Sequence, residues 1–237
     1  MYTPPHMTRL CLLACLVCLS LCVLSVPAAM AAQPEPFARL FGVDAYIAEG
    51  QDFPLHIKKH WLKVLKAEKD APCLQKNASR LPQPDASHWL NLTRQASTMD
   101  AMSRLRAVNA FFNKFPASTN QENFGDKDRW PSMEDFFNRR AGDRKAYALS
   151  KYFALRALGV PDDKLRIVLA HLPERKAPHA VLAVATDKGV FILDNDVQPL
   201  DLILPQEKFN ARFIPLLMFN EKGRWIFRQN MDLLNAR

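Results

Sequence analysis

The spacing of apolar residues changes near Leu165, and this change constrains the fold more than any other feature of the sequence. Before it, apolar residues recur every three or four positions, which is typical of amphipathic helices. After it, short apolar runs alternate with turn residues such as Asp-Lys-Gly at 187–189, which is typical of antiparallel strands. Helices followed by hairpins predict an α+β fold, with N-terminal helices packed on a C-terminal antiparallel sheet.

The same pattern predicts the individual elements. Helices are expected at 54–70, at 88–115 as one long or two consecutive helices, from Ser132 to a stop at Gly142, and from an N-cap at Asp143 to the proline at 161. Strands are expected at 165–172, 179–186, 190–195, 213–220 and 224–227. The segments 71–87 and 116–128 are expected to be loops, with Asp85 or Ser87 capping the helix that follows the first.

The first 31 residues have the features of a secretory signal peptide. One cation, Arg9, precedes an apolar run over 10–26, and Ala29-Met30-Ala31 forms a small-residue cleavage site. A single-pass anchor is the alternative, but the run is barely long enough to span a bilayer. Lipidation at Cys15 is disfavoured because the apolar stretch before it is too short. We therefore expect a signal peptide at 1–31 and one domain at 32–237, periplasmic and not membrane-spanning in its mature form.

Cysteine usage and charge narrow the class further. Four of the five cysteines lie in the expected signal peptide, so only Cys73 remains and no internal disulfide is expected. In an oxidising compartment such a cysteine is either buried or paired with another chain. The formal net charge is +8, and its cations are scattered among acids rather than gathered in a basic stripe. No nucleic-acid-binding module is recognisable, so a nucleic-acid partner is not expected.

Several stretches together carry a resemblance to a known family. They are "LRAVNAFFNKF", "DRWPSMEDFF", "GDRKAYALSKYFALRALGVPDDKLRIV", "PHAVLAV", "FILDN" and "FNEKGRWI", all between residues 100 and 227. The chain resembles the bacterial transglutaminase-like cysteine proteinases of the LapG type, which are periplasmic adhesin proteases. The resemblance implies a papain-like or transglutaminase-like core in which a cysteine at a helix N-terminus, a histidine and an aspartate form a triad. His179 and Asp194 match the family histidine and aspartate.

The nucleophile does not match. The family pattern resembles Gly-Asp-Cys-Glu-Asp-Tyr-Ala, whereas 142–148 reads Gly-Asp-Arg-Lys-Ala-Tyr-Ala. The unchanged flanks put Arg144 at the position of the cysteine, and a protonated guanidinium offers no lone pair for attack. Other candidate nucleophiles, Cys73 and Ser150, have no base that the sequence identifies beside them, and no G-x-S-x-G or H-E-x-x-H motif occurs.

Positions 143, 145 and 146 also decide whether a metal site is expected. The resemblance implies a calcium ion held by acids beside the nucleophile, but of these only Asp143 remains, with Lys145 and Ala146 at the other two positions. We expect a degenerate site that holds no metal and no cofactor. One hypothesis is that Arg144 and Lys145 replace the metal electrostatically; the other is drift after loss of function.

The remaining residues have ordinary alternatives. Without the resemblance, the sequence would indicate an exposed histidine at the start of a strand for His179 and an acidic residue in a turn for Asp194. Trp130 is either a core aromatic or, by resemblance, part of a surface that docks the periplasmic domain of a membrane receptor.

The sequence therefore predicts a LapG-like pseudoprotease, not an enzyme, that acts as a binding or regulatory module in adhesin or biofilm control. Its expected partner is a receptor's periplasmic domain or an adhesin segment. An active peptidase with an unrecognised nucleophile is the alternative, and a purely structural envelope protein is a third reading that leaves the motifs unexplained.

Overall fold

The computed structural model of the chain describes residues 35–74 and 81–235. The predicted signal peptide at 1–31 lies outside the described residues. In the part of the chain that is described, no helix is long and apolar enough to cross a membrane.

Helices dominate the first two thirds of the described chain and strands the last third. The helices are α1 (Leu55–Asp70), α2 (Asp85–Ala96), α3 (Ala101–Asn113), α4 (Asn120–Phe124), α5 (Met133–Arg139), α6 (Arg144–Ala157) and α7 (Asp232–Asn235). The strands are β1 (Arg39–Leu40), β2 (Val43–Asp44), β3 (Tyr46–Ile47), β4 (Leu165–Leu172), β5 (Ala177–Thr186), β6 (Gly189–Leu193), β7 (Leu204–Pro205), β8 (Ile214–Phe219) and β9 (Arg224–Ile226). Short 3-10 turns η2 (Asp162–Lys164), η3 (Pro173–Arg175), η4 (Gln206–Phe209) and η5 (Arg228–Asn230) join the later elements.

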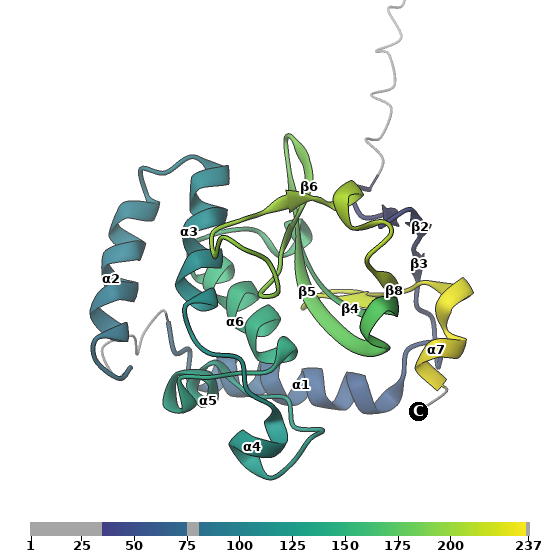
Figure 1. Cartoon of the computed structure of the whole chain (residues 1–237), viewed down its shortest axis with the longest axis horizontal. Helices are drawn as coiled ribbons and strands as arrows, with labels where there is room; N and C mark the ends of the chain where they lie inside the picture. The colour runs from purple at the N-terminus through teal and green to yellow at the C-terminus, as the bar shows by residue number, and fades with distance from the viewer. Residues whose placement is uncertain (1–34, 75–80, 236–237) are drawn as a thin grey trace, which may run out of the picture. The chain divides into compact units, whose positions relative to one another are not determined.

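Seven strands form one antiparallel sheet in the order β3-β9-β8-β4-β5-β6-β7, and β1 and β2 form a separate small hairpin. The helices gather on one side of this sheet (Figure 1). The α+β prediction, with N-terminal helices and a C-terminal antiparallel sheet, is confirmed. One strand departs from it, because β3 precedes all the helices and closes one edge of the sheet by pairing with β9.

The sheet is apolar on both faces, and each face has its own core cluster. Along β4, Leu165 and Ile167 face the helices, whereas Val168 and Ala170 face a second cluster. This alternation follows from the two-residue period of a strand. The second cluster is covered by aromatic side chains from the N-terminal hairpin and from 209–213. Both clusters draw their residues from 37–227, so the part of the chain that begins at Glu35 carries its own hydrophobic core.

The expected helix at 88–115 is two helices, with a break before Ala101. Asp100 caps α3 by accepting a hydrogen bond from the Ser103 backbone N–H at 3.0 Å. The prediction that Asp85 or Ser87 caps α2 is wrong. Asp85 is instead buried as the first residue of the helix and forms ion pairs with Lys114 and Arg140.

Two further boundaries differ from the sequence prediction. The expected loop 116–128 contains the short helix α4, which a Thr119–Glu122 capping box starts. The predicted stop of α5 at Gly142 is wrong, because the helix ends at Arg139 and is capped by Arg140, whose φ of 51° is left-handed. Gly142 has another role: its backbone bonds to 116–118, and a Cβ there would lie 2.8 Å from the Phe136 ring.

Gly142→Ala should destabilise the fold, because the added methyl group meets the Phe136 ring and the Ala146 methyl group, both at 2.8 Å. Overpacking of this kind costs about 1–3 kcal/mol of unfolding free energy. Urea unfolding of the variant measures the cost, with Ala141→Ser as the neighbouring control. A Gly142→Ala variant as stable as the parent would contradict the close approach of α5 and α6 at this glycine.

Candidate functional site

The N-terminus of α6 is fixed by Asp143. Its backbone is extended, with φ −84° and ψ 176°, and its Oδ1 accepts a hydrogen bond from the Ala146 N–H at 3.0 Å. An aspartate at the N-cap satisfies one of the free N–H groups of the first turn and matches the positive end of the helix dipole. The predicted cap is confirmed, and Arg144 is the first residue of the helix.

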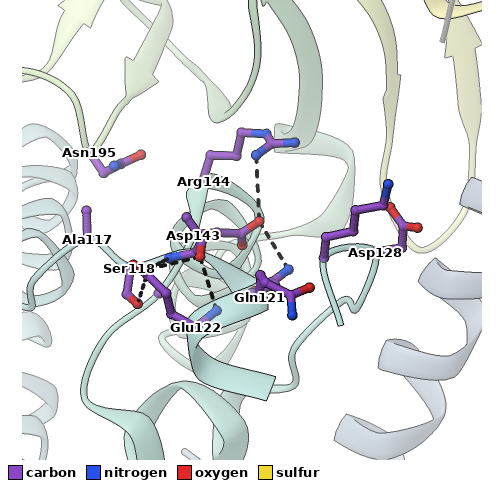
Figure 2. A pocket seen from close by; sticks show the side chains of 12 residues that line it. Ala117, Ser118, Gln121, Glu122, Asp128, Asp143, Arg144 and Asn195 are labelled. Carbon is purple, nitrogen blue, oxygen red and sulfur yellow. Dashed lines mark hydrogen bonds and ion pairs between the residues drawn. The ribbon is translucent and has the colours of Figure 1, made fainter. Parts of the chain in front are cut away.

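The second oxygen of Asp143 is surrounded by nitrogen donors. Its Oδ2 lies 2.8 Å from Lys145 Nζ and 3.9 Å from the Arg144 guanidinium, and it accepts a hydrogen bond from Asn120 Nδ2 at 3.2 Å. Both Asp143 and Lys145 are buried. In Figure 2, Arg144 stands above the Asp143 carboxylate, with Asn195 and Asp128 on either side of it. The start of α6 is therefore a buried ion pair rather than an open cluster of acids.

These residues do not fit a calcium ion. Calcium needs six to eight oxygen ligands, and among the described residues no group of three or more His, Cys, Asp or Glu could hold a metal. Both oxygens of Asp143 are already engaged, one by a backbone N–H and one by an ammonium group. The position of Lys145 agrees with the hypothesis that it takes the electrostatic place of a metal; independence from calcium stays a prediction.

His179 and Asp194 form a buried pair. His179 lies near the start of β5 and Asp194 directly after β6, and His179 Nε2 lies 2.7 Å from Asp194 Oδ1. Burial opposes ionisation of Asp194, but the hydrogen bond and charge of His179 prevail and hold the pKa of the carboxyl below its usual value. The Phe213 ring stacks on His179, and the Arg212 guanidinium lies 3.8 Å from Asp194 Oδ2. The two residues that the sequence proposed as triad partners are thus in contact.

A further charged residue belongs to this pair, and sequence reasoning missed it. Lys151, in the middle of α6, is wholly buried. Burial lowers the pKa of its ammonium group to about 7, although the nearby Asp194 carboxylate acts in the opposite direction. Among the described residues its Nζ has no hydrogen-bond partner. The sequence did contain a sign that Lys151 is buried. It lies four residues after Tyr147 and four before Leu155, which places it on the apolar face of the helix.

A cleft of about 810 Å³ opens at the N-terminus of α6. Its walls are residues 117–122, Lys127, Asp128, 142–144 and Asn195, so Arg144 shares the cleft with the residue that follows Asp194. His179 and Asp194 do not line it. Neither do a cysteine or any other histidine, and the Ser118 hydroxyl already donates to Glu122 Oε2 at 3.0 Å. The cleft offers charges of both signs and polar groups, which suit binding.

The other candidate residues lie away from this cleft. Cys73 is buried and lines a second cavity of about 310 Å³ with Glu68. Burial raises the pKa of the Cys73 thiol to about 12, and the charge of Glu68 raises it further. The carboxyl of Glu68 is itself raised to a pKa of about 7 by burial. Sequence reasoning identified no base beside Cys73; the structure brings an acid there, but it disfavours the thiolate. Ser150 is buried within α6.

Trp130 is half-buried between two other rings. Its ring is stacked on His60 at 5.9 Å and 7°, and it lies 5.8 Å from the Phe219 ring. It therefore packs on the edge of the helix-side core. Its role in binding a partner stays a prediction.

Comparisons with known proteins agree with the resemblance seen in the sequence. Residues 80–231 match a model of the bacterial transglutaminase-like cysteine proteinases. The structure is similar to calcium-bound Legionella pneumophila LapG, with 29% identity, a TM-score of 0.55, and coverage of 65% of this chain and 86% of that chain. It is also similar to a second structure of Legionella pneumophila LapG and to an EGTA-treated form, both with 27% identity and coverage of 69% and 92% of the two chains, with TM-scores of 0.55 and 0.54. Among curated proteins no match was found.

Calcium should not stabilise this chain, because Lys145 already neutralises Asp143. A ligand that binds only the folded state raises the melting temperature by mass action. We expect the same melting temperature in millimolar calcium and in excess chelator, at constant ionic strength. The Lys145→Glu, Ala146→Asp double variant is the matched comparison, since it restores acids at both positions. A calcium-dependent rise in the unchanged chain would refute the replacement of a metal by Lys145.

Lys151 should make stability depend on pH between about 7 and 10. Because its folded-state pKa is lowered from 10.5 to about 7, the unfolded chain binds more protons in this window, and the unfolding free energy rises with pH. Lys151→Met removes this contribution. The difference in unfolding free energy, parent minus variant, should therefore increase from pH 7 to pH 10, while the exposed control Lys188→Met gives a flat difference. A flat difference for Lys151→Met would mean that the amine titrates normally in the fold.

Proposed function

Because the chain belongs to the bacterial transglutaminase-like cysteine proteinase family, we propose that it is a non-cleaving member that binds a polypeptide partner in the periplasm. In this role the cleft at the start of α6 holds an extended segment of the partner without cutting it. The partner is an adhesin segment or the periplasmic domain of a membrane receptor, and the binding acts in adhesin or biofilm control.

The observation that carries the proposal is the identity of the first residue of α6. Cysteine nucleophiles gain reactivity at a helix N-terminus, where the dipole and a neighbouring imidazole stabilise the thiolate. In this chain that position is Arg144. A guanidinium stays protonated at physiological pH and has no lone pair with which to attack a carbonyl carbon. The covalent step expected of the family therefore has no group to perform it at this position.

The alternative of an active peptidase needs another nucleophile. Cys73 is a poor candidate because burial raises its thiol pKa to about 12, so almost no thiolate exists near neutral pH. Ser150 is buried as well, and neither residue lines the cleft beside Arg144. These environments support binding over catalysis.

The cleft supports a polypeptide partner through its charges. Lys127 and Arg144 supply cations, whereas Glu122 and Asp128 supply acids, all on the wall of one open cleft. Complementary charges of both signs fix the register of a bound segment and reject wrong partners more than they add affinity. Trp130 lies outside this cleft, and we assign it to a separate contact with a receptor domain, since tryptophan is enriched at interface hot spots. The predicted signal peptide supports the periplasmic location.

The purified mature chain should leave an adhesin fragment uncut, because Arg144 replaces the nucleophile. The fragment must be one that an active member of the family cleaves, and product is measured by electrophoresis over hours. Cleavage that disappears in Cys73→Ser or in Ser150→Ala would refute the proposal and favour the active-peptidase alternative. Binding of the same fragment, measured by calorimetry, should weaken in Arg144→Ala.

Arg144→Cys in a Cys73→Ser background is the positive arm of the same experiment. The helix N-terminus and Lys145 should lower the pKa of the new thiol below the usual value of about 8.5, so that iodoacetamide alkylates it quickly between about pH 6 and 7. His179→Ala should slow that reaction if the imidazole is within reach of the thiol. We expect cleavage to stay weak until Lys145→Glu and Ala146→Asp are added, because misplacement by about 1 Å can cost on the order of 100-fold in rate. A thiol that titrates near 8.5 and ignores His179 would refute the assignment of position 144.

A further inference from the structure

The exposed face of α1 combines leucines with lysines. Leu55, Lys58, Lys59, Leu62, Lys63 and Lys66 recur every three or four residues, so they form one stripe along the helix, here called the α1 ridge. The opposite face buries Ile57, Trp61, Val64 and Leu65 in the core, which fixes the ridge outward.

The leucines of the ridge are unusually exposed. Leu55 is 60% exposed and Leu62 is 45% exposed. Six large hydrophobic residues are exposed in the described part of the chain, only three of them by 45% or more, and two of those three, Leu55 and Leu62, lie seven residues apart on the same stripe. Leucine favours the helical backbone, but at these positions it also leaves apolar area in water, which is unfavourable unless another surface covers it.

The lysines of the ridge are only partly neutralised. Lys66 pairs with Asp70 at 2.5 Å, but within the described residues Lys58, Lys59 and Lys63 form no ion pair. The other acid of α1, Glu68, turns inward and accepts a hydrogen bond from the Met133 backbone N–H at 2.9 Å. The ridge therefore presents a local positive charge around two apolar side chains.

We propose that the α1 ridge binds anionic lipid headgroups at a bilayer surface. A cationic helix face with apolar side chains lies in the interface between headgroups and acyl chains, where lysines meet phosphates and leucines enter the acyl boundary. Long lysine side chains extend their ammonium groups to the headgroups while their stems cover apolar surface.

A protein partner fits this surface less well. The centres of protein interfaces are depleted in lysine and enriched in tryptophan, tyrosine and arginine. The α1 ridge contains lysine and leucine and none of those three residue types. It is also separate from the cleft at α6, whose lining includes no residue of α1, so lipid binding and the binding of a polypeptide segment in that cleft can succeed or fail independently.

Vesicle cosedimentation of the chain from residue 32 onward tests the proposal. The chain should bind vesicles of mixed phosphatidylglycerol and phosphatidylcholine but not vesicles of phosphatidylcholine alone. Binding should weaken strongly as ionic strength rises from about 0.05 M to 0.5 M, since salt screens exposed charges. Lys58→Gln, Lys59→Gln and Lys63→Gln together should lower the partition coefficient by about 100-fold at low salt. Leu55→Ala with Leu62→Ala should lower it at both salt concentrations, because the apolar contribution is not screened.

The matched control removes the same charge elsewhere. Lys176, Lys188 and Lys208 are exposed outside α1, and changing all three to Gln should leave most of the binding intact. If both triple variants lost vesicle binding equally, the binding would depend only on net charge and not on the α1 ridge, and the proposal would be overturned. Absence of binding to the phosphatidylglycerol vesicles, or tighter binding to polyglutamate than to them, would also overturn it. The melting temperature of each variant confirms that the fold is kept.

Discussion

The burial of α6 against the sheet is the constraint on which the rest of the structure depends. Ten of its 14 residues are buried, and the helix packs on β5 and β4 on one side and on α3 and α5 on the other. A helix enclosed in this way must satisfy its N-terminal N–H groups within the protein, which Asp143 does. It also carries two lysines, Lys145 and Lys151, into the interior, and each lies near an acid rather than in water. The packing of α6 therefore sets both the ion pair at the start of the helix, Asp143 with Lys145, and the burial of Lys151 near Asp194.

The sequence was most informative where a long pattern repeats. The α1 and α6 helices, the strands β4, β5, β8 and β9, and the cap at Asp143 were all predicted within a few residues, because each rests on several consistent positions. The pairing of His179 with Asp194 was expected only from the family resemblance. The structure supplies it through strand register: Leu182, in the middle of β5, pairs with Leu193, the last residue of β6, so the first half of β5 lies beside the residues that follow β6.

Sequence reasoning failed where a single residue's role is set by distant contacts. The edge strands β3 and β7 are two residues long, too short for any period to be read. Asp85 resembles a cap in sequence, but Arg140 and Lys114, far along the chain, draw it into buried ion pairs. Lys151 was missed for the same reason: a lysine at a helical position is ordinarily solvated, and only the enclosing sheet and Asp194 make it unusual.

The charges at the start of α6 show how a buried N-cap carboxylate can be neutralised within the chain. A carboxylate buried without a partner is costly, and removing one partner of a buried pair can cost about 3–5 kcal/mol. A cluster of buried acids that relies on a cation from solvent is neutralised only while that cation is bound. In this chain the cation at Asp143 is the ammonium group of Lys145, which belongs to a residue two positions along the same chain and lies 2.8 Å from Asp143 Oδ2. The local concentration of such a cation does not depend on the surroundings, so the helix start is neutralised as soon as the chain folds. The buried carboxylate at the N-cap of α6 therefore has its counter-charge within the chain itself.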